Sequence, residues 1–134
     1  MRPPVPYARP SETRLRGWNR AVRIGGHRVH LGVYRGRPSI AVHGVGFLDL
    51  PERPLKVDCD IHKVGADFRV TMKIVTELAT LALSHGAPPG RVAAVLRNGT
   101  GGPAGIVEDC DGVESANSVS DLIGQVLLLE EVGS

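Results

Sequence analysis

The spacing of apolar residues changes part-way along the chain, and this change restricts the fold more than any other feature. Residues 55–62 alternate strictly between apolar and polar side chains, which is typical of a strand with one buried face. From Asp67 onward, apolar residues recur at steps of three and four, which is the spacing of an amphipathic helix. Strands followed by helices predict an α+β fold, in which an antiparallel sheet of about four strands is covered by two to three helices.

The first half of the chain predicts the strands of this sheet. Gly25-Gly26 lies between two alternating stretches and supplies the positive φ angles of a two-residue hairpin turn. A turn at residues 35–38 leads into a third strand, and residues 44–54, with their two glycines and two prolines, are expected to form a loop. The expected strands of the single sheet are 20–24, 27–34, 39–43 and 55–62.

The second half predicts two helices in succession. The first covers residues 67–85 and ends at Gly86, with a proline just beyond as a stop. The second begins at Pro89 and ends at Asn98-Gly99, since both residues tolerate the left-handed conformation that ends helices. The glycine-rich residues 99–117 are expected to form a loop with at most one short strand.

A last helix is expected near residues 120–131, preceded by Ser118 and Asp121 at the spacing of a capping box. Together with helix 67–85 it is expected to cover one face of the sheet. Its apolar residues are too many for one face, so we expect part of it to contact another copy of the chain in a homo-oligomer. These residues are Leu122, Ile123, Val126, Leu127, Leu128 and Leu129.

Length and composition indicate one globular domain. The 134 residues suit a single domain, since ordinary domains contain about 100–150 residues. No apolar run approaches the roughly 18 residues of a membrane span. Residues 1–17 hold four prolines and four arginines, so we expect an extended arm before a single domain at 18–134. Because no signal-peptide pattern is found, cytoplasmic localisation is expected.

Charge is divided unevenly along the chain. Residues 1–38 contain nine arginines and one acidic residue, whereas residues 39–134 contain seven basic and thirteen acidic residues. The basic part can face nucleic acid, the phosphates of a nucleotide or the acidic part of the protein, and charge alone does not choose among them. Nucleic acid ranks last, because Tyr7, Trp18 and Tyr34 are too scattered for a stacking track. Trp18 is instead expected to anchor the arm.

No catalytic or metal-binding constellation is found. His27 and His30 are three residues apart in an expected strand, so their side chains point to opposite faces. Cys59 lies on the apolar face of its strand and is expected to be an inert core thiol. The second cysteine, Cys110, is likewise expected to be a free thiol. We therefore predict no catalytic residue, no metal and no cofactor bound by this chain.

If a nucleotide binds, its phosphates need fixed cations and N–H donors, and these converge at two places in the sequence. Two arginines flank the Gly25-Gly26 turn, and Arg97 precedes a glycine-rich loop whose N–H groups can surround an anion. This loop follows a helix, so it is neither a Walker nor a Rossmann loop. In the alternative interpretation, Arg97 pairs with an acid such as Glu108 or Asp109. The predicted nucleotide-binding residues are Arg23, Arg28, Arg97, Asn98, Gly99 and Gly101.

Three stretches of the sequence resemble one known module. They read RLRGWNRAVRIGGHRVHLGVYRGRPSI at 14–40, MKIVTELATLALSHGAPPGRVAAVLRNGTGGPAG at 72–105 and ANSVSDLIGQVL at 116–127. In this order they are similar to the C-terminal module of adenosylcobalamin-dependent ribonucleotide reductases, the TSCPD domain. The string that names the module stands here as Asn-Ser-Val-Ser-Asp at 117–121, without its cysteine and proline.

The resemblance implies a role in nucleotide metabolism without catalysis by this chain. The family enzyme reduces ribonucleotides in a large barrel that uses adenosylcobalamin, a radical cysteine and further redox cysteines. A 134-residue chain with two cysteines cannot hold that barrel beside the module. The implied function is a stand-alone nucleotide-binding or accessory module. Its alternatives are an oligomeric sponge of viral type for cyclic or signalling nucleotides, and a split subunit or fragment of a B12-dependent reductase.

The partners follow from the same implied function. They are a second copy of the chain, a nucleotide and a reductase catalytic subunit. We expect neither nucleic acid nor a membrane to be a partner.

Overall fold

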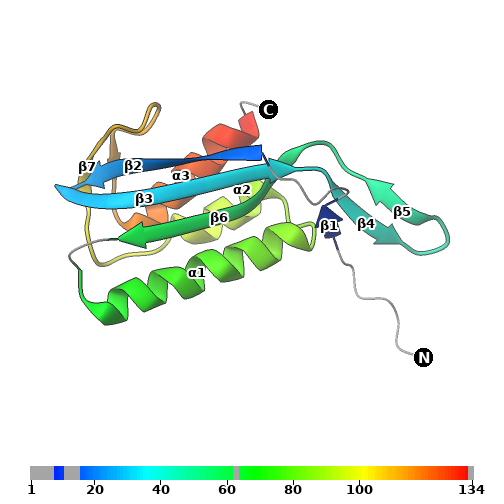
Figure 1. Cartoon of the computed structure of the whole chain (residues 1–134), viewed down its shortest axis with the longest axis horizontal. Helices are drawn as coiled ribbons and strands as arrows, with labels where there is room; N and C mark the ends of the chain where they lie inside the picture. Colours follow the sequence, from blue (N-terminus) through cyan, green and yellow to red (C-terminus); the bar gives the residue numbers. More distant parts are fainter. Residues whose placement is uncertain (1–7, 11–15, 62–63, 133–134) are drawn as a thin grey trace.

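The computed structural model describes residues 8–10, 16–61 and 64–132, and it confirms the α+β fold class (Figure 1). The described part of the chain contains two antiparallel sheets and three helices. Six strands come before the first helix, and two short strands lie between the second and third helices. The elements are β1 (Ala8–Pro10), β2 (Arg16–Ile24), β3 (His27–Gly36), β4 (Pro38–Val42), β5 (Gly46–Asp49), β6 (Arg53–Ile61), α1 (Ala66–Ser84), α2 (Pro89–Leu96), β7 (Gly105–Glu108), β8 (Ser115–Ala116) and α3 (Val119–Val132).

The β2–β3 hairpin is the centre of the larger sheet. Gly25 and Gly26 form its turn with φ angles of 54° and 84°, and residues other than glycine rarely adopt such positive values. Strand register then follows, with Ile24 opposite His27 and Val22 opposite Val29. The turn is also tied to β7, because the Gly25 N–H donates to the Ile106 carbonyl at 2.9 Å. The predicted hairpin and its turn are confirmed.

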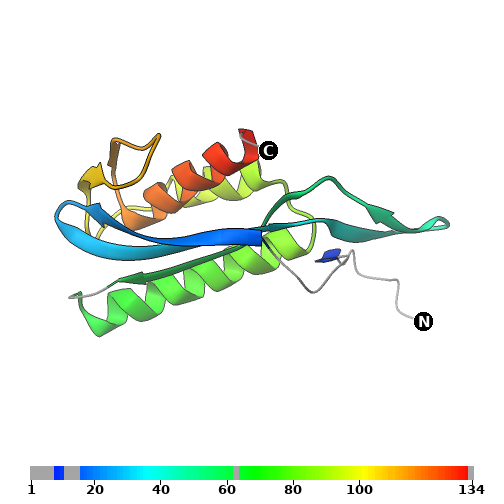
Figure 2. The same cartoon turned by 45° about the horizontal axis from the view of Figure 1, so that its top comes forward.

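The larger sheet has five strands in the order β6-β3-β2-β7-β8. Alternate residues of its three long strands are buried against the helices, and the residues between them face away. The buried set is Val22, Ile24, Val29, Leu31, Val33, Val57, Cys59 and Ile61. Both views place α2 and α3 together over one face of this sheet, while α1 runs beside β6 (Figures 1 and 2).

Strand β4 does not join the larger sheet, which corrects the prediction of one sheet containing residues 39–43. Each strand has only two edges, and β3 uses its edges for β2 and β6. Strand β4 therefore pairs with β1 and β5 in a separate three-stranded sheet that projects from the body (Figure 1). The prediction of a loop over 44–54 is also wrong, since β5 and the start of β6 lie in that segment.

The expected arm is partly structured. Of residues 1–17, the structure describes 8–10 and 16–17; the rest of this prediction lies outside the described residues. Residues Ala8–Pro10 form β1 and pair with β4, and β2 begins at Arg16, inside the segment expected to be the arm. Residues 99–117 likewise contain two short strands, β7 and β8, where at most one was expected.

Helix α1 runs along the outer edge of the larger sheet, beside β6, and its buried residues join the same core. The Thr80 hydroxyl accepts a hydrogen bond from the Val57 N–H at 3.1 Å and donates one to the Val57 carbonyl at 3.0 Å. Arg69 of α1 forms an ion pair with Asp60 of β6 at 2.9 Å. Because Val57 lies on edge strand β6, these contacts satisfy backbone groups that an open edge leaves unpaired.

Helix α3 begins with a variant of the predicted capping box, in which the Asp121 side chain accepts from the residue before Ser118. The Ser118 hydroxyl accepts from the Asp121 N–H at 2.9 Å, and the Asp121 carboxylate accepts from the Asn117 N–H at 2.9 Å. Four of its six apolar residues are covered within the chain, while Leu128 is half-buried and Leu129 is exposed, so the expected contact with another copy stays a prediction. Leu122, Ile123, Val126 and Leu127 are at most 3% exposed, and of the six residues only Leu129 is classed as exposed, at 42%. Burial on both sides is possible because α3 packs against the sheet and α2 together.

Among the described residues, no helix has both the length and the apolar character needed to cross a bilayer.

Candidate functional site

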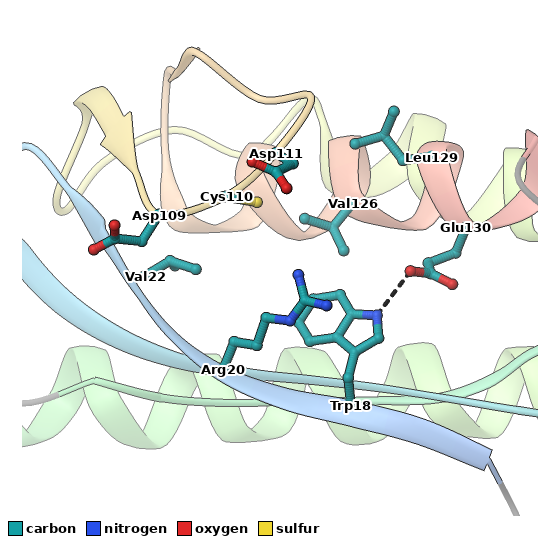
Figure 3. A pocket seen from close by; sticks show the side chains of 9 residues that line it. All are labelled: Trp18, Arg20, Val22, Asp109, Cys110, Asp111, Val126, Leu129 and Glu130. Atoms are coloured by element: carbon teal, nitrogen blue, oxygen red, sulfur yellow. Dashed lines mark hydrogen bonds between the residues drawn. The ribbon is translucent and has the colours of Figure 1, made fainter.

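A cavity of about 250 Å³ opens between β2, the loop after β7 and α3 (Figure 3). Its lining combines an indole ring, a guanidinium, a thiol and three carboxylates with apolar side chains. The lining residues are Trp18, Arg20, Val22, Asp109, Cys110, Asp111, Val126, Leu129 and Glu130. Trp18 and Arg20 point into it because they precede Val22 at steps of two, so they share its face of the strand.

The Trp18 ring is held at both its edge and its face. Its Nε1–H donates to Glu130 Oε1 at 2.7 Å, and the Arg20 guanidinium carbon lies 4.9 Å from the ring centroid. Arg35 supports the same carboxylate, because its Nη1 donates both to Oε2 and to the backbone carbonyl of Glu130. The sequence predicted that Trp18 anchors the N-terminal arm, whereas the described contacts join β2 to α3. Glu130 was not identified from the sequence, since its partners are more than ninety residues away.

The two thiols of the chain are not activated. Burial raises the pKa of the Cys110 thiol in the cavity, with nearby Arg20 opposing this shift and Asp111 adding to it. Burial, with Asp60 and Asp58 nearby, raises the pKa of Cys59 to about 12. A thiol is nucleophilic only as the thiolate. Both cysteines are free, and Cys59 packs in the core as predicted.

The charge of the cavity determines which ligands it suits. One guanidinium, that of Arg20, and the three acidic residues Asp109, Asp111 and Glu130 line the cavity. Carboxylates repel a phosphate, so this cavity favours a neutral or cationic group that can contact the indole. No group of three or more histidine, cysteine or acidic side chains among the described residues is placed to hold a metal ion. Among the described residues that line the cavity, no nucleophile lies beside a base.

The predicted nucleotide-binding residues near the hairpin turn lie together. Arg23 of β2 is directly opposite Arg28 of β3, and both are exposed. On its other side Arg23 is opposite Glu108 of β7. The turn contacts the glycine-rich loop, because a Cβ added to Gly25 would lie 2.2 Å from the Ala104 carbonyl oxygen. The end of the hairpin and the end of the loop are therefore neighbours.

The predicted residues at the start of the loop lie at the junction of α2 and α3. Arg97 Nε donates to the Asp121 carboxylate at 3.2 Å, so its partner is neither of the acids suggested by the sequence. Gly99 is needed for packing, since an added Cβ would lie 2.7 Å from the Ser120 side chain. Its carbonyl accepts a hydrogen bond from the Ser118 hydroxyl at 2.7 Å.

Asn98 and Gly101 complete this predicted set. Both are exposed, and Gly101 has a φ of 91°. The N–H groups of Asn98 and Gly99 donate to the Val95 and Leu96 carbonyls at 3.2 and 3.1 Å, so these two donors are already used within the chain.

Comparison with known proteins gives one informative similarity. Over 120 residues the chain is 26% identical to a vitamin B12-dependent ribonucleotide reductase of Agrobacterium fabrum. The match covers 90% of this chain but only 8% of that enzyme, so the chain corresponds to a small module of its relative. No family model matches the chain, and no solved structure matches it.

Proposed function

We propose that this chain is a non-catalytic accessory module of a B12-dependent ribonucleotide reductase, of the TSCPD type. The observation that carries the proposal is the similarity to such an enzyme across 90% of the chain. A match that extends over nearly all elements of the fold supports a shared module, because a short shared motif would align only locally. Reduction itself then belongs to the much larger remainder of the enzyme.

The side chains support a role without chemistry. Ribonucleotide reduction by the family enzyme needs reactive cysteines, and both cysteines here have raised pKa values. The contacts beside the Trp18 cavity tie β2 to α3, which suits a rigid binding module. The module is therefore assigned to docking and positioning, in the cytoplasm where such an enzyme works.

Complementation tests this proposal. The segment that matches this chain is removed from the Agrobacterium enzyme, and ribonucleotide reduction is measured with and without added chain. We expect reduction to fall on deletion and to be at least partly restored in trans. Val57→Asp serves as the negative control, because it places a charge at a site that is 2% exposed. Unchanged reduction on deletion, or no restoration by a chain shown to be folded, contradicts the proposal.

A second candidate function is nucleotide sequestration, with or without the reductase. It is favoured by the facing pair Arg23 and Arg28 beside the glycine-rich loop. Two guanidinium groups at one site suit phosphate better than a single amine. Calorimetric titration with mono-, di-, tri- and cyclic nucleotides tests it, and Arg28→Ala is expected to weaken binding roughly ten- to a hundredfold. A panel without any binder excludes this candidate and leaves the accessory role standing.

A further inference from the structure

Helix α1 carries an exposed apolar stripe along its whole length. Val70, Ile74, Leu78 and Leu81 are between 52% and 60% exposed. Their spacing of four, four and three residues places them on one side of the helix. Both views put α1 at the outer boundary of the molecule, so this side has no cover from the described chain (Figures 1 and 2).

The stripe is opposite the side by which α1 already packs on its own chain. The buried residues of the helix are Met72, Thr76, Ala79 and Leu83. With about 100° of rotation per residue, the centre of the stripe lies roughly 180° from the centre of this buried side. A surface helix of a monomer normally has one apolar side and one polar side. Helix α1 has two apolar sides, which is typical of a helix buried between two layers.

Helix α2 extends this apolar surface. An apolar groove of about 420 Å³ runs between α1 and α2, and Leu78 lies in its wall. Val95 of α2, also in the wall, is 73% exposed. Stripe and groove together form one continuous exposed apolar surface, and a large surface of this kind usually marks an interaction site.

The charged residues beside the stripe indicate what covers it. Lys73 and Glu77 are exposed, lie on the same flank of α1, and form no ion pair with any described residue. When two copies of one helix pack antiparallel about a two-fold axis, the same flank of each copy meets. With the axis near residue 75, Lys73 of each copy lies opposite Glu77 of the other. The pattern is therefore complementary to itself.

We propose that a second copy of this chain covers the stripe, with the two α1 helices packed antiparallel in a symmetric dimer. In this register Val70 lies opposite Leu81 of the second copy, and Ile74 lies opposite Leu78. The apolar and charged residues thus select the same axis independently. The proposal places self-association on α1 besides the contact expected on α3, and it does not rest on the proposed reductase function.

Molar mass in solution is the first test. Light scattering after size-exclusion chromatography of the full chain, at about 100 µM and after serial dilution, is expected to report a dimer that dissociates. Ile74→Glu is expected to raise the dissociation constant about a hundredfold while circular dichroism stays unchanged, because the residue is 52% exposed. Ile106→Glu is the matched control, since Ile106 is 71% exposed on β7. A wild-type monomer, or a dimer unaffected by Ile74→Glu, overturns the proposal.

Charge reversal tests the register. Lys73→Glu and Glu77→Lys each place like charges opposite each other, so each variant alone is expected to dimerise about tenfold more weakly. The double variant is expected to regain dimerisation. A mixture of the two single variants is expected to form a heterodimer at wild-type strength. In this heterodimer, position 73 of each copy again lies opposite a residue of opposite charge at position 77 of the other. Equal dimerisation by all of these proteins contradicts the antiparallel register.

The same variants distinguish a second copy from the reductase as the occupant. If wild type stays monomeric and Ile74→Glu abolishes complementation of the truncated reductase, α1 is the reductase contact and the dimer proposal is wrong. If Ile74→Glu abolishes the dimer and complementation persists, the dimer stands and the two surfaces are separate. Failure of complementation by wild type contradicts the proposed function alone.

Discussion

The start of α3 depends on one buried carboxylate, and its removal is the sharpest test of the fold. The Asp121 side chain is only 5% exposed and accepts from the Asn117 N–H at 2.9 Å, Gln125 Nε2 at 3.1 Å and Arg97 Nε at 3.2 Å. Asp121→Ala removes the two carboxylate oxygens that accept these three hydrogen bonds and leaves the donors without this partner. It leaves the Ser118 side of the capping box intact, because that bond uses the Asp121 backbone.

The magnitude follows from the burial of each contact. Loss of the cap, in which the Asn117 N–H donates to the carboxylate, costs about 1 kcal/mol. Loss of the charge-assisted hydrogen bond from Gln125 costs about 1.5–3 kcal/mol. The ion pair with Arg97 adds only about 0.5 kcal/mol, because the Arg97 side chain is 51% exposed and screened by water. Asp121→Ala is therefore expected to destabilise the fold by about 3 kcal/mol, which corresponds to roughly 10 °C in Tm for a chain of this length.

Thermal and urea unfolding, followed by circular dichroism at neutral pH, measure this loss. Arg97→Ala is the matched control, since it removes the exposed partner of the same pair and is expected to lower Tm by about 2 °C. If both variants lower Tm equally, the ion pair and not the helix cap holds the junction. A shift below about 2 °C for Asp121→Ala refutes the reasoning altogether.

Three further outcomes are expected for the edge strand β6. Val57→Asp should abolish cooperative unfolding because the site is 2% exposed, whereas Asp58→Ala on the other face should change Tm little. Thr80→Val should lower the free energy of unfolding in urea by about 1–3 kcal/mol, since the N–H and the carbonyl of Val57 both lose their partner. Thr71→Val, at an exposed site within α1, should lower it much less. The pKa of Cys59 is raised from 9.0 to about 12, so the free energy of unfolding should fall as pH rises from about 9, where the unfolded thiol ionises and the folded one does not. Cys59→Val should remove this part of the alkaline loss, and identical pH profiles for the two proteins contradict the argument.

Features that depend on near neighbours in the chain were predictable from the sequence. The Gly25-Gly26 turn, the alternation in β6 and the capping box of Ser118 and Asp121 are all confirmed. Each arises from residues within a few positions of one another, where backbone sterics, side-chain period and local hydrogen bonds act directly. The α+β fold class follows from the same local patterns, because the change of period separates strands from helices.

Only the tertiary structure decided which elements meet. Strand β4 matches a strand pattern, yet its sheet was set by β6 taking the free edge of β3. The partner of Arg97 is an acid on another helix, and the cavity around Trp18 depends on Glu130, more than a hundred residues away. Apolar residues on α3 and α1 look alike in sequence, but four of the six on α3 are covered by the sheet and α2, whereas the stripe on α1 is left exposed. Period identifies an apolar side; what covers it depends on contacts between distant segments, which no local pattern contains.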